Sequence, residues 1–441
     1  INEDLFSLDI KRFQKFHSSK NFIMERVTET LGDLYAMHWP FKQHKTSRNQ
    51  ILLPYHNELK KLGACFGSSG GFERPMWYAL DGKKPEYDYS FDYQNWYPSA
   101  EFETKNTKKN VGLFELSPFS KFDLTGTNVH QELQRICTAN IKDTIGKSTY
   151  TQMLNHDGGI ETDVTITCIE KNYFRVIGPA ATREHDKFHI LKHISNTVKL
   201  EDNTEEFCCL GLYGPKTRDL LSKISKDDFS NKNIKFSYGK FVNINGIKVW
   251  AQRLSYVGEI GFELYVNLKD SKKLYFSIVE EGKNHKLSHC GSHAMDIMRM
   301  ENGFLHWGHD ISPEENQYQA GLGFAISYKK NIDFIGKEAL LKIKDKNPSK
   351  ILAMMELKNN KPGNPLLLNE EPIYLDDKII GRTTSGNYSF NFNKNISFGY
   401  VNSGNTIEEL KGKNISIEVE KIKYPASIIE KPLNQKNIKN I

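Results

Sequence analysis

Apolar and polar residues alternate over residues 160–166, directly after a Gly-Gly pair. One face of this stretch carries Ile160, Val164 and Ile166, and the other carries Glu161 and Asp163. A period of two predicts a β-strand with one buried face. Most Asp side chains on strands are exposed. The stretch alone therefore leaves open whether Asp163 is a solvated carboxylate or points into a pocket.

The same patterns predict the other elements. Apolar residues recur at helical spacing from Ile23 to Leu34, and Pro40 is expected to end that helix. The pattern over residues 247–266 predicts two strands joined by a glycine turn. The pattern over residues 293–302 predicts a helix that ends at Gly303. After about residue 345 only short strand-like runs remain, which is typical of a small barrel or sandwich. Mixed elements followed by strands alone predict an α+β multidomain protein.

Composition narrows the function classes. The chain has 441 residues, enough for two to four domains. Its net charge of +6 is spread without a dense basic stripe, which argues against nucleic-acid binding. No apolar run approaches the roughly 18 residues of a membrane span. We therefore expect neither a nucleic-acid nor a membrane partner.

Cysteine usage and missing motifs bear on cofactors. The six cysteines form no CxxC pair, and no Cys/His cluster has the spacing of a zinc site, so we expect no metal site. We expect the thiols to be free and mostly buried. Few thiols in so long a chain indicate a reducing compartment, the cytoplasm or a mitochondrial matrix. No GxGxxG follows a predicted strand, and no P-loop, GxSxG or HExxH motif occurs. A flavin such as FAD is therefore expected only if an upstream or partner half binds it.

Five stretches together resemble one family. They are GGIETDVTI, GLYGPKTRDLL, YVGEIGFELYV, MRMENGFLHWGHDI and QAGLGFAI, and they occur in the order seen in the glycine cleavage T-protein, a tetrahydrofolate-dependent aminomethyltransferase. Two further stretches, FGSSGGFERPMWYAL and GRTTSGNYSF, resemble the C-terminal portion of the dimethylglycine and sarcosine dehydrogenases. Those enzymes join a flavin-dependent amine oxidase to a T-protein-like folate module.

The resemblance implies a fold and a domain division. We expect a T-protein-like clover-leaf of two α+β domains and a C-terminal β-barrel, preceded by a helical linker. Residues 1–90 resemble the junction to a flavin half, residues 91–345 the folate-binding domains, and residues 346–435 the barrel.

The resemblance also assigns roles to residues. Asp163 matches the family's carboxylate beside the reactive folate nitrogens, where it could take up a proton. Glu263 matches the residue that grips the pterin, since a carboxylate accepts two adjacent N–H bonds. Tyr256 either contacts the pterin or is an ordinary core tyrosine, and Glu259 is expected to be solvated. Arg382 is a candidate for the folate's carboxylate tail.

One position departs from the family. T-proteins carry a pterin-contacting Arg immediately before the residue matching Asp296, and this chain has Met295 there. Arg299 is a candidate for a folate contact, although we favour a structural ion pair with Glu301.

The sequence is compatible with three functions. The first is the folate-dependent module of an amine demethylase, capturing the carbon of a methylated amine or its iminium as 5,10-methylenetetrahydrofolate. The alternatives are a free-standing aminomethyltransferase and a non-catalytic folate-binding subunit of a larger oxidase.

Overall fold

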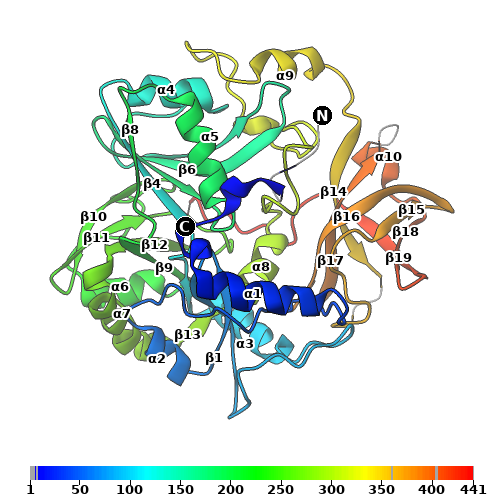
Figure 1. Cartoon of the computed structure of the whole chain (residues 1–441), viewed down its shortest axis with the longest axis horizontal. Coiled ribbons are helices and arrows are strands. Elements are labelled where there is room, and N and C mark those ends of the chain that lie inside the picture. The colour runs from blue at the N-terminus through cyan, green and yellow to red at the C-terminus, as the bar shows by residue number, and fades with distance from the viewer. Residues whose placement is uncertain (1–4, 6–7, 359–360, 403–405, 441) are drawn as a thin grey trace.

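Three units meet around the middle of the molecule. The structure is a computed structural model that describes residues 5, 8–358, 361–402 and 406–440. Figure 1 shows two mixed units, drawn in teal and green, and a barrel drawn in orange and red. The predicted α+β architecture of two mixed units and a C-terminal barrel is confirmed. No helix among the described residues is long and apolar enough to cross a membrane.

The first unit is a six-stranded sheet backed by helices. In sheet order its strands are β10 (Gly239–Ile244), β11 (Ile247–Gln252), β12 (Gly261–Asn267), β9 (Phe207–Tyr213), β3 (Val111–Glu115) and β13 (Leu287–Cys290). Its helices are α3 (Tyr97–Lys109), α6 (Thr217–Ile224), α7 (Leu268–Gly282) and α8 (Ser292–Glu301). The face that packs on α6 and α7 carries Phe262 and Leu264 of β12. Strand alternation therefore turns Glu263 and Tyr265 to the opposite face.

The second unit is a five-stranded antiparallel sheet. In sheet order its strands are β5 (Ser148–Leu154), β6 (Ile160–Glu170), β7 (Tyr173–Gly178), β4 (Ser120–Thr125) and β8 (Lys199–Asp202). Helices α4 (Val129–Ile136) and α5 (Arg183–His193) cover one face, where Val164 and Ile166 join the core. The expected half-buried strand is thus confirmed, and Asp163 lies on the face away from these helices.

The third unit is a closed barrel. Its strands, in order around the barrel, are β14 (Lys350–Leu357), β17 (Lys394–Asn402), β16 (Lys378–Ser389), β15 (Pro372–Leu375), β18 (Ile415–Val419) and β19 (Ile422–Ile429). The barrel is filled by aliphatic side chains such as Ile373, Ile417 and Val401. Two short helices accompany the barrel along the chain: α9 (Lys337–Ile343) precedes β14, and α10 (Ile407–Leu410) connects β17 to β18.

The N-terminal segment lies on the outside of these units up to about residue 50, and from there it packs against the core of the first unit. It holds η2 (Ile10–Arg12), η3 (Lys15–Ser18), α1 (Lys20–Asp33) and α2 (His56–Lys61), followed by a hairpin of β1 (Ala64–Ser69) and β2 (Phe72–Tyr78). The expected first helix is present, but its predicted end was wrong, because α1 stops at Asp33 and not at Pro40. The chain turns there, with Ala36 N–H and the His38 ring both bonded to the Asp33 carbonyl.

Candidate functional site

The two sheets turn their remaining faces toward one shared set of side chains. This central cluster consists of Phe114, Leu116, Ile169, Cys209, Tyr213, Trp250, Val257, Tyr265, Cys290, Ala294, Met295 and Met298, with Phe119, Tyr173, Ile177 and Tyr256 packed against it. Tyr265 comes from the same face of β12 as Glu263. On β6, Asp163 shares its face with Thr165, whose cross-strand partner is Ile177. The predicted carboxylates therefore face the same region from opposite sheets.

Asp163 is held by its neighbour on β5. Gln152 is its cross-strand partner, and Gln152 Nε2 donates to Asp163 Oδ1 over 2.7 Å. Burial raises the pKa of Asp163 to about 6, although the hydrogen bonds from Gln152 and Tyr150 oppose the rise. A carboxylate with a pKa this close to neutral is a better proton acceptor than an ordinary aspartate.

A second glutamine fixes the orientation of the first. Gln317 Nε2 donates to Gln152 Oε1 at 2.6 Å and to Thr138 Oγ1 at 2.9 Å. All three side chains are fully buried. Because the Gln152 oxygen is engaged by Gln317, its amide nitrogen must face Asp163.

Glu263 is half-buried at the edge of the central cluster. Tyr265 Oη donates to Glu263 Oε2 at 2.7 Å. Burial raises the pKa of Glu263, and the neighbouring tyrosine hydroxyls act in the opposite direction. Across the sheet, Gln252 is its cross-strand partner. Gln252 Oε1 accepts from Trp250 Nε1 at 3.1 Å, whereas the buried Gln252 Nε2 has no hydrogen-bond partner among the described residues.

Tyr256 lies in the loop between β11 and β12, packs against the central cluster and contacts the loop after α8. Its hydroxyl donates to the Leu305 carbonyl at 2.8 Å, and its ring stacks on Phe304 with centroids 5.9 Å apart. Burial raises the pKa of Tyr256; the charge of Arg299 opposes this rise, and the carboxylates of Asp296 and Asp163 add to it. The hydroxyl proton and one ring face of Tyr256 are therefore engaged within the protein, which leaves the other ring face for a planar ligand.

Arg299 is the centre of a buried network. Its Nη1 lies 2.6 Å from Asp310 Oδ2, its Nε 2.9 Å from Asp296 Oδ1, and its Nη2 donates to Ser385 Oγ at 2.8 Å. The favoured ion pair with Glu301 was wrong, because Glu301 accepts from Ser389 and Asn391 instead. Arg299 therefore joins α8, the following loop and the barrel.

Two other predicted residues lie at the periphery. Arg382 keeps 56% of its side chain exposed and pairs with Glu370 at 2.7 Å. A folate carboxylate there would have to replace that partner. Glu259 was expected to be solvated, which was wrong. It is fully buried in the turn before β12, and Lys436 Nζ from the C-terminal segment lies 2.5 Å from its carboxylate.

Sequence reasoning missed the three glutamines of this site. Counting back across the Gly-Gly turn from the Leu154–Ile160 pair would place Gln152 opposite Thr162, whereas in the structure it lies opposite Asp163. A bulge at Met153/Leu154 shifts that count by one residue. Gln317 and Gln252 come from distant segments, and nothing in their local sequence marks them.

Comparisons with known proteins agree with this geometry. Residues 55–330 match the GCVT N-terminal domain, and residues 350–434 match the glycine cleavage T-protein C-terminal barrel domain. The chain belongs to the glycine cleavage T-protein family. The resemblance found in the sequence is thereby confirmed. Residues 2–51 separately match the FAD dependent oxidoreductase central domain.

The relatives are longer proteins. The chain is 35% identical to 4-methylaminobutanoate oxidase (formaldehyde-forming) of Paenarthrobacter nicotinovorans, covering 97% of this chain and 51% of that protein. It is 30% identical to the mitochondrial dimethylglycine dehydrogenase of Rattus norvegicus, covering 98% of this chain and 50% of that protein. The chain thus spans about half the length of these relatives.

A solved structure supports the fold. The glycine cleavage system aminomethyltransferase T of Bartonella henselae superimposes with a TM-score of 0.74 at 21% identity, covering 88% of this chain and 99% of that one. The T-protein-like fold assigned from the sequence is confirmed.

Proposed function

We propose that this chain is the tetrahydrofolate-dependent one-carbon transfer module of an amine demethylase of the dimethylglycine or sarcosine dehydrogenase type. The proposed reaction joins tetrahydrofolate to a formaldehyde-level carbon, delivered as an iminium ion or formaldehyde. The products are 5,10-methylenetetrahydrofolate and the released amine or water. The observation that supports this most is Asp163, a carboxylate with a pKa of about 6 that faces the central cluster opposite Glu263.

The residues around Glu263 fit the edge of a pterin. A carboxylate can accept two adjacent N–H bonds, and the unpartnered Gln252 Nε2 can donate to a carbonyl beside them. A buried donor without a partner is costly, so a bound polar ligand would relieve it. We propose that Glu263 and Gln252 orient the pterin, and that the Tyr256 ring packs against it.

Asp163 is proposed as the proton acceptor. Tetrahydrofolate would supply the two nitrogen atoms that the incoming carbon links. Asp163 would accept the proton that such a nitrogen loses and would stabilise cationic charge nearby. Gln152 keeps Asp163 in place and favours its ionised form.

A flavin-binding partner is proposed as the source of the oxidised carbon. An amine must lose a hydride before its methyl carbon reaches the formaldehyde level, and FAD is the acceptor that the match of residues 2–51 favours. We therefore place amine oxidation on a flavin half, and carbon capture on this chain.

Calorimetry with tetrahydrofolate tests the pterin assignment. Glu263→Gln should weaken binding by about 1.5–3 kcal/mol, the range for hydrogen bonds to a charged group. Lys272→Gln, on the exposed side of α7, serves as the matched control and should bind like the wild type. Equal binding by Glu263→Gln and the wild type would refute the assignment.

A non-catalytic folate-binding subunit is the second candidate. Met295, buried in the central cluster where T-proteins carry an arginine, favours it. Turnover decides between them. The catalytic proposal requires this chain to accelerate methylenetetrahydrofolate formation from formaldehyde, whereas a binding subunit would hold tetrahydrofolate without accelerating that reaction. A free-standing aminomethyltransferase would need no flavin partner.

A further inference from the structure

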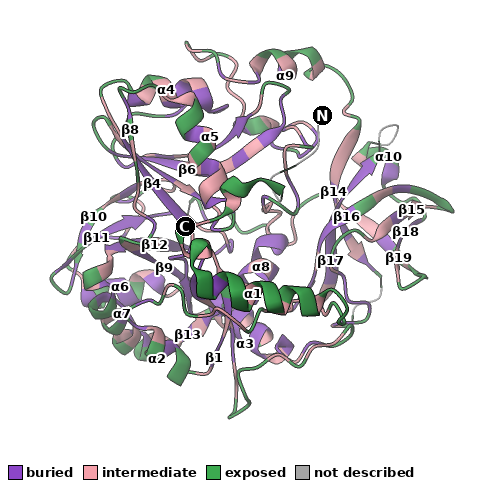
Figure 2. Cartoon of the chain, viewed as in Figure 1, coloured by how far each residue is buried: buried purple, intermediate pink, exposed green. Residues whose placement is uncertain are grey.

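The first helix carries its apolar side chains on the solvent side. Ile23, Met24, Val27, Leu31 and Leu34 are all between 47% and 61% exposed. From Met24 onward they recur every three or four residues, and Ile23 adjoins Met24, so they form one continuous stripe along α1 and its C-cap. Figure 2 shows α1 at the front of the molecule, with most of its surface coloured as exposed. We refer to these five residues as the α1 stripe.

The other side of α1 is polar and faces the protein. Arg26 Nη2 donates to the Thr46 carbonyl at 2.7 Å. Glu29 accepts from the backbone N–H groups of Lys45 and Thr46 at 2.6 and 3.0 Å. Phe22 is the one helix residue that is buried. An ordinary surface helix buries its apolar face and exposes its polar face, so α1 is inverted.

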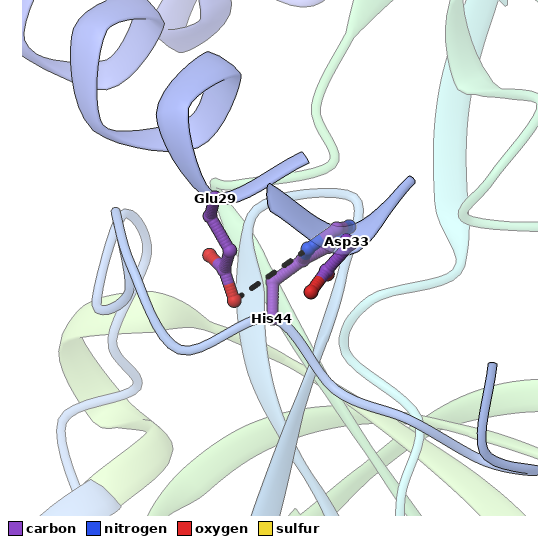
Figure 3. A group of neighbouring side chains, drawn as sticks. All are labelled: Glu29, Asp33 and His44. Carbon is purple, nitrogen blue, oxygen red and sulfur yellow. Dashed lines mark ion pairs between the residues drawn. The ribbon is translucent and has the colours of Figure 1, made fainter. Parts of the chain in front are cut away.

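A group of polar side chains fixes this orientation. Figure 3 shows Glu29, Asp33 and His44, with His44 Nδ1 3.9 Å from Glu29 Oε1. Their ligand atoms lie within 4.8 Å of one another. Both oxygens of Glu29 already accept from the backbone, and Asp33 pairs with Lys42 Nζ at 2.5 Å. We therefore assign this group to fastening α1 on residues 42–47, which leaves the α1 stripe facing outward.

Exposed apolar side chains are concentrated in this part of the chain. Of the 26 large apolar side chains that are exposed among the described residues, eleven lie between Leu5 and Met37. Such a concentration marks an interaction surface. The whole of this segment falls within residues 2–51, which match the FAD dependent oxidoreductase central domain, whereas the folate-type domains begin after it.

We propose that the α1 stripe is the docking face for a flavin-dependent oxidoreductase module, on the same polypeptide or on a separate subunit. An amphipathic helix binds by placing its apolar face in a groove of the partner. The segment that carries the stripe matches an oxidoreductase family, and the relatives that match the chain are about twice its length, so a flavin-dependent oxidoreductase module is the occupant that these comparisons favour. This inference rests on the flavin partner of the proposed function but not on folate binding.

A photo-crosslinking amino acid placed at position 27, in place of Val27, identifies the protein that contacts the α1 stripe in the source cells. The expected product joins Val27 to a peptide from a flavin-dependent oxidoreductase sequence, at a yield at least tenfold above that of the same probe at Lys272 on α7. Products with only a second copy of this chain, with lipid or with an unrelated protein would overturn the proposal. A yield no higher than at Lys272 would overturn it too.

A charged double variant gives a second, independent measurement. Val27→Glu with Leu31→Glu should reduce crosslinking from a probe at Met24 at least tenfold, while leaving the melting temperature of the chain within about 1 °C of the wild type, as for exposed substitutions. Lys272→Glu with Lys273→Glu is the matched control and should change neither. A large loss of melting temperature would mean that the stripe packs within this chain, which contradicts the proposal. Tetrahydrofolate binding, measured on the same proteins, reports separately on the proposed function.

Discussion

Gln152 and Asp163 stand opposite each other on neighbouring strands, and the Gln152 amide donates to Asp163 Oδ1 over 2.7 Å. Gln317 holds the other end of that amide, so Gln152 cannot turn its oxygen toward the carboxylate without losing a buried bond. Burial favours the protonated form of Asp163, whereas Gln152 favours the ionised form. The balance between them sets the pH above which Asp163 can accept a proton.

Gln152→Leu should favour the protonated form of Asp163. Without the donor, the pKa of Asp163 rises above its present value of about 6. A hydrogen bond to a charged group contributes about 1.5–3 kcal/mol, and about 1.4 kcal/mol corresponds to one pKa unit. The acidic limb of the rate profile for methylenetetrahydrofolate formation should therefore move up by about 1–2 pH units. The pH dependence of the rate at saturating tetrahydrofolate measures it.

Gln317→Leu tests the same effect with a milder change. It leaves the Gln152 donor in place but removes the bond that orients it, so a smaller shift in the same direction is expected. If neither variant moves the acidic limb while both lower the rate equally at every pH, the glutamines act on the fold and not on Asp163.

The half-buried strand of Asp163 could be predicted because alternation along one strand is a local property. The same holds for α8 and the barrel, whose patterns and turn residues lie within a few positions. Glu259 could not be placed, because its burial depends on Lys436, more than 170 residues away. The α1 stripe is the reverse case. Its apolar residues have the helical spacing that normally indicates a buried face, but in this structure they face solvent. Periodicity identifies the face that needs a partner but not where the partner lies.

We expect the main role of Arg299 to be stabilising the fold, and not binding folate. Arg299→Met leaves Asp310 buried without its counter-ion, and breaking a buried pair in this way costs about 3–5 kcal/mol. Denaturant unfolding should show that loss. Arg382→Ala removes an exposed pair and should change the free energy of unfolding by less than about 1 kcal/mol. If Arg299→Met instead keeps its stability and loses tetrahydrofolate binding, the guanidinium contacts the folate.

His185 should make stability fall at alkaline pH. Burial alone would lower the pKa of His185, but the carboxylates of Asp186 and Glu161 raise it to about 9. A histidine whose folded pKa is raised stabilises the fold below its unfolded pKa of about 6.5, and this contribution is lost as pH rises toward 9. His185→Gln should therefore destabilise the protein at pH 6 more than at pH 9.5. Melting curves across that range check it, and a difference independent of pH would rule out the charged histidine.

Asp163→Asn should separate catalysis from stability. The substitution keeps the shape and an acceptor for Gln152 but removes the base, which typically costs about 10²–10⁴ in rate. The folded pKa of about 6 lies above the ordinary aspartate value of 3.8, so the folded protein binds this proton more tightly than the unfolded chain does. Wild-type stability therefore falls as pH rises from about 4 to 6, and the Asn variant escapes that loss. Its melting temperature should match the wild type near pH 4 and exceed it at pH 8.

The two measurements on Asp163→Asn distinguish three roles for this side chain. A large loss of rate with a higher melting temperature at pH 8 identifies a carboxylate kept ionised for catalysis against its own burial. A solvated strand residue would instead leave the rate and the melting temperature unchanged. A lower melting temperature at every pH, with normal activity per folded molecule, would make Asp163 a structural acceptor for Gln152, and the proton acceptor of the site would have to be sought elsewhere.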